Sequence, residues 1–272
     1  MLKRVGALAL VTCKEGIRDR SLFGILLFAL FVLGLNVAVA GFFMRDLGKV
    51  TVDMNLAALS FAGLLLVFFI CINLMAKDID KKTIHLVLSK PFSRGEYIYG
   101  KYLGLVLLVV CTLALLLVFS TTTVAGVNAM YPKYFGGFTW SVYFWAVAFI
   151  GVQLALLCAI VVFFSALTTS SFITLVFSVA TYLVGVSIEE VLFYLKSQAA
   201  AGEVVASETL RAVLEVVAWM VPNFSAFDLK TEAAHGLELE PVRLLTSAGY
   251  GLGYVLILLW LATLIFRRRE FN

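Results

Sequence analysis

The stretch from residue 76 to residue 101, AKDIDKKTIHLVLSKPFSRGEYIYGK, concentrates charge, an apolar stripe, a proline and a helix-start signal. Ile84, Val87 and Leu88 are spaced i, i+3, i+4, which predicts one apolar face on a short helix. Pro91 ends this helix, because proline disfavours helical geometry in the residue before it. An apolar face on a basic loop is suited to docking against a partner, so we expect a structured docking element rather than a plain basic loop.

The residues after this proline carry two further patterns. Ser93 and Glu96 fit a capping box, which predicts that a second helix begins here and continues into a membrane span. The sequence 95–101, GEYIYGK, matches the GxxxxGK of a nucleotide-binding loop, but Tyr102 follows where Ser or Thr must hold magnesium. Its interior residues are bulky and no strand precedes it, so we do not expect nucleotide binding.

Glu189 and Glu190 resemble the paired glutamates of intramembrane CAAX-type proteases. That chemistry also needs histidines within the spans, and the two histidines of this chain, His85 and His235, fall in expected loops. We expect the glutamates to face water at the level of the lipid headgroups, although an intramembrane hydrolase stays open as a minor alternative.

The four cysteines form no disulfide framework in the sequence, and we expect them to act as small apolar filler. There is no CxxC and no cluster of His and Cys, so the sequence gives no support for a metal site.

Composition indicates how these residues are positioned. The chain is 62% hydrophobic and 14% charged, far from the quarter charged that is typical of soluble domains. The pattern predicts an all-α polytopic membrane protein, with residues 1–272 forming a single transmembrane domain. Six apolar runs are long enough to cross a bilayer: Ser21–Phe43, Leu56–Met75, Tyr99–Ala125, Ser141–Ala166, Phe172–Tyr194 and Leu244–Phe266.

The Lys and Arg residues predict the orientation. With the N-terminus inside, the cytoplasmic segments hold 14 of them and the outer segments hold seven, so both termini are expected in the cytoplasm. Residues 1–20 then form a cytoplasmic amphipathic segment, which acts either as simple topogenic charge or as a helix in the inner interface.

The outer segment 195–243 precedes the last span. Its apolar residues Leu210, Val213, Leu214 and Val217 predict an amphipathic helix capping the outer mouth. A second short helix is expected over Asp228–Ala234, ended by Gly236.

The interiors of the expected spans lack Asp, Glu, Lys, Arg and His. Ion-coupled carriers normally bury such groups as relays or binding sites. Polar residues such as Asn36 and Ser120 are expected to serve helix–helix hydrogen bonds instead. A transporter of this kind would therefore draw its energy from a partner.

Four segments together resemble the membrane subunit of a type-2 ATP-binding-cassette (ABC) transporter. The N-terminal Lys14-Glu15…Arg18…Arg20, the loop 76–101, Pro222-Asn223…Phe227-Asp228-Leu229 and the basic end Phe266-Arg267-Arg268-Arg269 are each similar to a family motif. The chain departs from the family where Asp78 and Asp80 replace glutamates, and where Lys82 replaces a frequent glycine.

The resemblance implies a six-helix permease in the plasma (inner) membrane that pairs with a second copy or a paralogue. It also implies two cytoplasmic ABC ATPase subunits, which bind the ATP, so that the chain is not itself an enzyme and needs no cofactor of its own. Export of a substrate is expected, and no nucleic-acid partner. The loop 76–98 would be the coupling element, with these contact residues: Asp78, Lys82, Thr83, Ile84, Val87, Leu88, Ser89, Pro91 and Arg94. The alternative is a non-transporting membrane scaffold or assembly factor.

Overall fold

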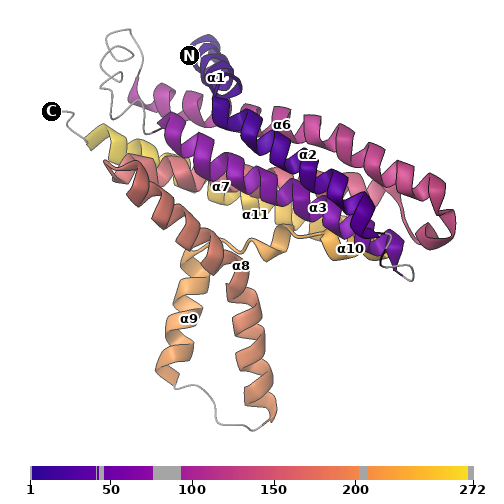
Figure 1. Cartoon of the computed structure of the whole chain (residues 1–272). Coiled ribbons are helices and arrows are strands. Elements are labelled where there is room, and N and C mark those ends of the chain that lie inside the picture. Colours follow the sequence, from indigo (N-terminus) through magenta and orange to yellow (C-terminus); the bar gives the residue numbers. More distant parts are fainter. Residues whose placement is uncertain (1, 41, 43–45, 76–92, 202–207, 269–272) are drawn as a thin grey trace.

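The computed structural model describes residues 2–40, 42, 46–75, 93–201 and 208–268, and these ranges contain helices and no strand (Figure 1). The long elements are α1 (Leu2–Ile17), α2 (Arg20–Ala40), α3 (Leu47–Leu65), α6 (Arg94–Met130), α7 (Trp140–Leu167), α8 (Ser171–Ala201), α9 (Glu208–Met220) and α11 (Pro241–Arg268). The short ones are the π-helical turn η1 (Leu66–Cys71), the 3-10 turns η2 (Pro132–Phe135) and η3 (Ser225–Phe227), and the helix α10 (Lys230–His235).

Six helices are long and apolar enough to cross a membrane, as the sequence predicts. They are Arg20–Val39, Leu47–Met75, Arg94–Met130, Trp140–Leu167, Ser171–Tyr194 and Pro241–Arg268. The largest difference from the expected bounds is at α3, which begins at Leu47 rather than near Leu56. Its first turns carry exposed Lys49 and Asp53, so the helix extends beyond the apolar run, and Lys49 Nζ lies 3.6 Å from Asp46 Oδ1.

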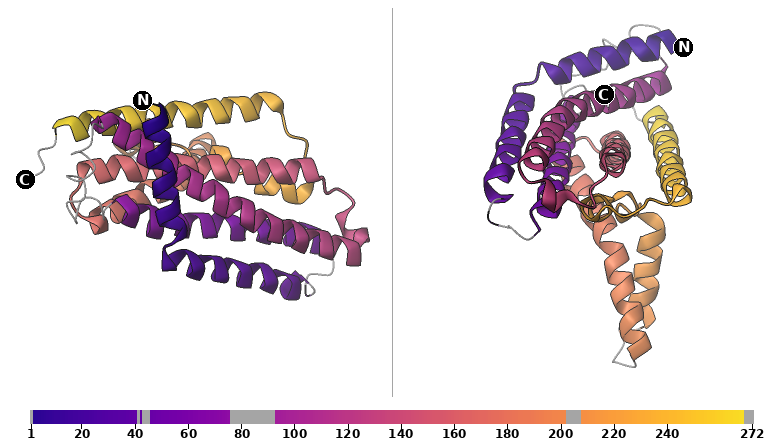
Figure 2. Two further views of the ribbon diagram at one scale, coloured as in Figure 1. Left: turned by 90° about the horizontal axis from the view of Figure 1, so that it is seen from above. Right: turned by 90° about the vertical axis from the view of Figure 1, so that its right-hand side faces the viewer.

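Helix α7 is the central helix of the bundle. Of its most apolar stretch, 67% is buried, against 22–33% for α2, α8 and α11. Its residues are apolar on every side of the helix, which is typical of a helix surrounded by others. The view along the bundle in Figure 2 shows α7 end-on, with α6 and α11 on either side of it.

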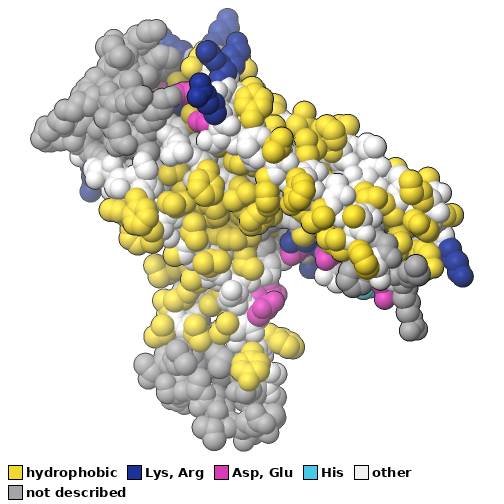
Figure 3. Space-filling view, viewed as in Figure 1, with side chains coloured by type: hydrophobic (Ala, Val, Ile, Leu, Met, Phe, Trp, Pro, Cys, Tyr) yellow, Lys and Arg dark blue, Asp and Glu magenta, His cyan; other side chains and the backbone are white. Residues whose placement is uncertain are grey.

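The surface of the bundle separates into an apolar girdle and polar ends. Hydrophobic side chains cover its length, while Lys and Arg gather around α1 at one end (Figure 3). We call this the basic end: α2, α6 and α8 begin there, α7 and α11 finish there, and it carries Arg20, Arg94, Lys101, Arg267 and Arg268. The opposite end is called the far end.

Candidate functional site

Helix α6 begins at the basic end with the predicted capping box. The Glu96 backbone N–H donates to Ser93 Oγ at 3.2 Å, and the Ser93 backbone N–H donates to Glu96 Oε2 at 2.8 Å. Each residue thus satisfies one of the amide groups that a helix start leaves unpaired. The start of α6 is therefore fixed immediately after the segment 76–92, and this prediction is confirmed.

The start of α6 is also tied to the end of α11. Arg94 Nη1 donates to Phe266 O at 3.1 Å and to Arg267 O at 2.8 Å. A cation bonded to the last carbonyls of a helix is favourable, because those groups lack partners and carry the negative end of the helix dipole. The Tyr97 ring stacks on Phe266 with 5.4 Å between centroids, and both side chains are buried. Arg94 and Tyr97 thus join residues far apart in the sequence.

Helix α1 packs along the first turns of α6. A Cβ atom added to Gly100 would lie 2.7 Å from Leu8 Cδ2, and one added to Gly104 would lie 2.7 Å from Ala9 O. Such close contact needs small residues at i and i+4, which is the GxxxG pattern of packed membrane helices. The N-terminal segment is therefore a helix docked on α6.

Of the residues expected to couple to an ATPase, Arg94 is the one that the structure places. The other expected contacts lie outside the described residues: Asp78, Lys82, Thr83, Ile84, Val87, Leu88, Ser89 and Pro91. Their flanks are placed, because the helix that continues from η1 reaches buried Met75 and α6 starts at Arg94. Residues 95–101, which match GxxxxGK, are helical within α6, so they do not form the open loop that a phosphate requires.

Toward the far end, a buried polar network joins four helices. Asn36 Nδ2 and Asn55 Nδ2 both donate to Thr51 O, at 3.1 and 2.8 Å. Ser120 Oγ donates to Asn55 Oδ1 at 2.9 Å and also contacts the Tyr143 hydroxyl. The network therefore links α2, α3, α6 and α7, and it bears out the expectation that Asn36 and Ser120 hold helices together.

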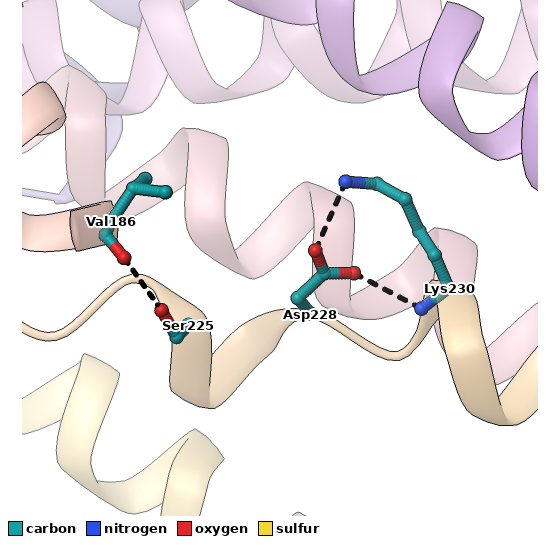
Figure 4. A network of polar contacts seen from close by, with 4 residues as sticks. All are labelled: Val186, Ser225, Asp228 and Lys230. Atoms are coloured by element: carbon teal, nitrogen blue, oxygen red, sulfur yellow. Dashed lines mark hydrogen bonds and ion pairs between the residues drawn. The ribbon is translucent and has the colours of Figure 1, made fainter. Parts of the chain in front are cut away.

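The segment after α9 contacts α8 where that helix changes direction (Figure 1). The Phe224 backbone N–H donates to Gly185 O at 3.0 Å, and Ser225 Oγ donates to Val186 O at 2.9 Å (Figure 4). In a straight helix these carbonyls would accept only from the amides four residues later. Competing donors of this kind are an established cause of helix bending.

Asn223 is the polar centre of this contact. Its backbone N–H donates to the Tyr250 hydroxyl at 2.8 Å, and its Nδ2 donates to Glu189 Oε2 at 2.9 Å. Nearby, Asp228 accepts from the Lys230 backbone and pairs with Lys230 Nζ at 3.1 Å (Figure 4). Glu189 and Glu190 line a cleft of about 840 Å³ between α8 and α9. Glu189 thus has a structural partner in Asn223.

The outer segment differs from the predicted cap. Helix α8 continues beyond Tyr194 to Ala201, so α9 pairs with the end of α8, and the two project from the bundle as a helical hairpin (Figure 1). Because α8 supplies a partner helix, α9 need not lie flat over the mouth. The second expected helix is present as α10, and Gly236 ends it with φ 64°, a left-handed conformation that favours glycine.

The cysteines, expected as small apolar filler, lie in two pairs. The Cys13 thiol of α1 is within hydrogen-bonding reach of Cys111 on α6, and Cys71 in η1 is within reach of Cys158 on α7. All four are free thiols. Sequence spacing gives no signal for these pairs, because they arise from the register between packed helices. Among the described residues, no group of three or more His, Cys, Asp or Glu could hold a metal ion.

Comparison with known proteins agrees with the bundle and with the four motif segments. A model of the family described as ABC-2 family transporter protein matches residues 8–271, nearly the whole chain. A search of curated proteins finds no match. Six apolar helices and this match make the chain a multi-pass membrane protein of the permease class, the component of such transporters that is not itself the ATPase. The chain therefore belongs to the ABC-2 transporter family.

Proposed function

We propose that this chain is the membrane-spanning subunit of an ABC transporter that exports its substrate across the plasma membrane. ATP is bound and hydrolysed by a separate dimer of cytoplasmic ATPase subunits, and the chain needs no cofactor of its own. A second copy of the chain, or a paralogue, completes the transmembrane part. The family match supports the partnership with an ABC ATPase in general.

The observation that carries this proposal is the way α6 is held directly after the segment 76–92. At its C-terminal side, Ser93 and Glu96 fix the start of α6, and Arg94 bonds the last carbonyls of α11. Helix α1 also packs on the first turns of α6. A push on the segment by an ATPase would therefore act on α1, α6 and α11 together. Such a push shifts the permease between states only if the ATPase contacts those states differently.

The test is co-purification of the intact permease from native membranes in mild detergent. The wild type should bring down a soluble ATPase in about equal amount. Replacing Ile84, Val87 and Leu88 with Asp should remove that ATPase and abolish transport, because three charges would replace the apolar face that the sequence predicts.

The matched control carries three Asp substitutions at exposed apolar positions away from this segment, namely Phe42, Leu237 and Val242. This variant should keep the ATPase. If the wild-type chain purifies intact without any ATPase, the transporter role fails and a scaffold role replaces it. If the ATPase remains bound to the coupling variant, docking lies elsewhere.

A further inference from the structure

The turn between α1 and α2 forms a cleft at the basic end. Two backbone hydrogen bonds close this turn: the Arg18 N–H donates to Lys14 O at 3.2 Å, and the Asp19 N–H donates to Gly16 O at 3.1 Å. Helix α2 then begins at Arg20. The cleft has a volume of about 740 Å³ and is lined by Val11, Lys14, Glu15, Arg18, Asp19 and Arg20. We call this site the elbow.

The cations of the elbow are available to a ligand. Lys14, Arg18 and Arg20 are exposed, and none of the three forms an ion pair or a side-chain hydrogen bond with another residue in the described part of the chain. Asp19 Oδ1, in contrast, accepts the Ser21 backbone N–H at 2.9 Å, and Glu15 is half-buried with an interaction of its own. Three cations without an ion-pair partner among the described residues therefore line one cleft, which also holds the carboxylates of Glu15 and Asp19.

An exposed apolar stripe continues from the elbow along α2. Arg20 is followed at intervals of three, four and four residues by Phe23, Leu27 and Phe31, which places all four on one face of the helix. The three apolar side chains are 65%, 73% and 65% exposed, on a helix that is long and apolar enough to span the membrane. The cations thus lie at the start of a surface suited to hydrocarbon.

We propose that the elbow is a binding site for an anionic glycerophospholipid. Lys14, Arg18 and Arg20 hold its phosphate and headgroup, and an acyl chain lies along the stripe of Phe23, Leu27 and Phe31. Arginine binds phosphate through paired N–H groups, and long basic side chains readily reach the headgroup level from a helix end. The combination of charge and adjoining apolar surface favours a lipid over a free phosphate ion, because a phosphate ion has no acyl chain to contact the stripe.

The bound lipid would also hold α1 in place. Helix α1 already packs on α6 through Gly100 and Gly104, and its exposed face carries Leu10 and Ile17 next to the elbow. A lipid bridging the start of α2 and the end of α1 adds a contact on the opposite side from α6. This inference concerns the permease alone and does not depend on the proposed ATPase.

The test is retention of defined lipids by the purified full chain, counted by native mass spectrometry. The protein is loaded with dioleoyl phosphatidylglycerol or dioleoyl phosphatidylcholine and then stripped with detergent. The wild type should keep the anionic lipid in preference to the neutral one. Replacing Arg18 and Arg20 with Gln should lower that retention about tenfold, since each basic group near an anionic headgroup contributes appreciably to binding. Replacing both with Lys should preserve most of it.

The matched control replaces Lys49 and Lys133, two exposed cations at the far end, with Gln. It removes the same charge and should retain the anionic lipid. If the double Gln variant does not purify as a folded protein, Lys14→Gln alone should lower retention several-fold. Equal retention by the wild type and the Gln variants of the elbow, equal loss in the control, or no preference for the anionic lipid would each overturn the proposal. So would a variant that keeps the lipid but loses a bound cytoplasmic protein, because the elbow would then be a protein contact.

Discussion

At the scale of single residues, the buried hydroxyl of Ser120 gives a direct test of the polar network. It donates to Asn55 Oδ1 and contacts the Tyr143 hydroxyl, and all three side chains are buried. Ser120→Ala should destabilise the protein by about 1 kcal/mol, because it leaves buried polar atoms without a partner. In a detergent-solubilised melting experiment this corresponds to a loss of about 2–4 °C.

Thr121 provides the control for this prediction. Its hydroxyl bonds Leu117 O at 2.8 Å and Val118 O at 2.9 Å, both on its own helix. Thr121→Ala should therefore leave the melting temperature almost unchanged. Equal melting temperatures for the two variants would mean that the interhelical bond contributes nothing beyond a bond within one helix.

Residues with local signals were predictable from the sequence. Ser93 and Glu96 are three residues apart and bond within a single turn, so their spacing determines the contact. Arg94 was expected to contact an ATPase, and its observed partners are the carbonyls of Phe266 and Arg267. No local pattern identifies that contact, because it depends on where α11 ends in space. The pairing of Cys13 with Cys111 escaped prediction for the same reason.

At the scale of elements, the packing of α1 on α6 can be disturbed at one glycine. A Cβ atom at Gly104 would lie 2.6 Å from Thr12 Cβ and 2.7 Å from the Ala9 carbonyl oxygen. Gly104→Val should push α1 away from α6, because backbone cannot yield as a flexible side chain does. The native thiols of Cys13 and Cys111 report this separation, since a short bifunctional thiol reagent should join them in the wild type. The variant should give several-fold less cross-link.

Gly126 is the matched control, because it lies on the same helix and nothing lies within 4 Å of a Cβ atom there. Gly126→Val should cross-link as the wild type does. Burial, with a smaller effect of Cys111, raises the pKa of the Cys13 thiol, so less of it is thiolate at neutral pH. Cross-linking should therefore be faster at higher pH in the wild type. A Gly104→Val protein with undiminished cross-linking would contradict the close packing of α1.

The spans were predictable because each is a long apolar run, and such runs need no knowledge of the other helices. The path of the outer segment was not. Helix α8 continues past its apolar run, and its bend depends on Phe224 and Ser225 donating to the carbonyls of Gly185 and Val186. The resemblance drew attention to Pro222 and Asn223 as a motif. In the structure, the segment that begins with these two residues contacts both α8 and α11 through hydrogen bonds of Asn223.

At the scale of the whole molecule, the basic end gathers the elements that a cytoplasmic partner would move. The start of α6 is held to the end of α11 by Arg94, and α1 packs on α6 beside the elbow. The polar network joins four spans toward the far end, while the hairpin of α8 and α9 projects sideways from between the two ends (Figure 1). Contacts with an ATPase would thus fall at the basic end, away from the polar network.

The orientation of the bundle follows from its charge and can be measured directly. The greater number of Lys and Arg at the basic end predicts that this end faces the cytoplasm. In a background without the native cysteines, Lys133→Cys at the far end should react with a membrane-impermeant maleimide in intact spheroplasts. Lys3→Cys on α1 should react only after the membrane is permeabilised; both positions are exposed, so access to the reagent is decided by sidedness. The reverse labelling would place the segment 76–98 outside the cell, where no cytoplasmic ATPase could reach it. The proposed coupling would then be excluded by topology alone.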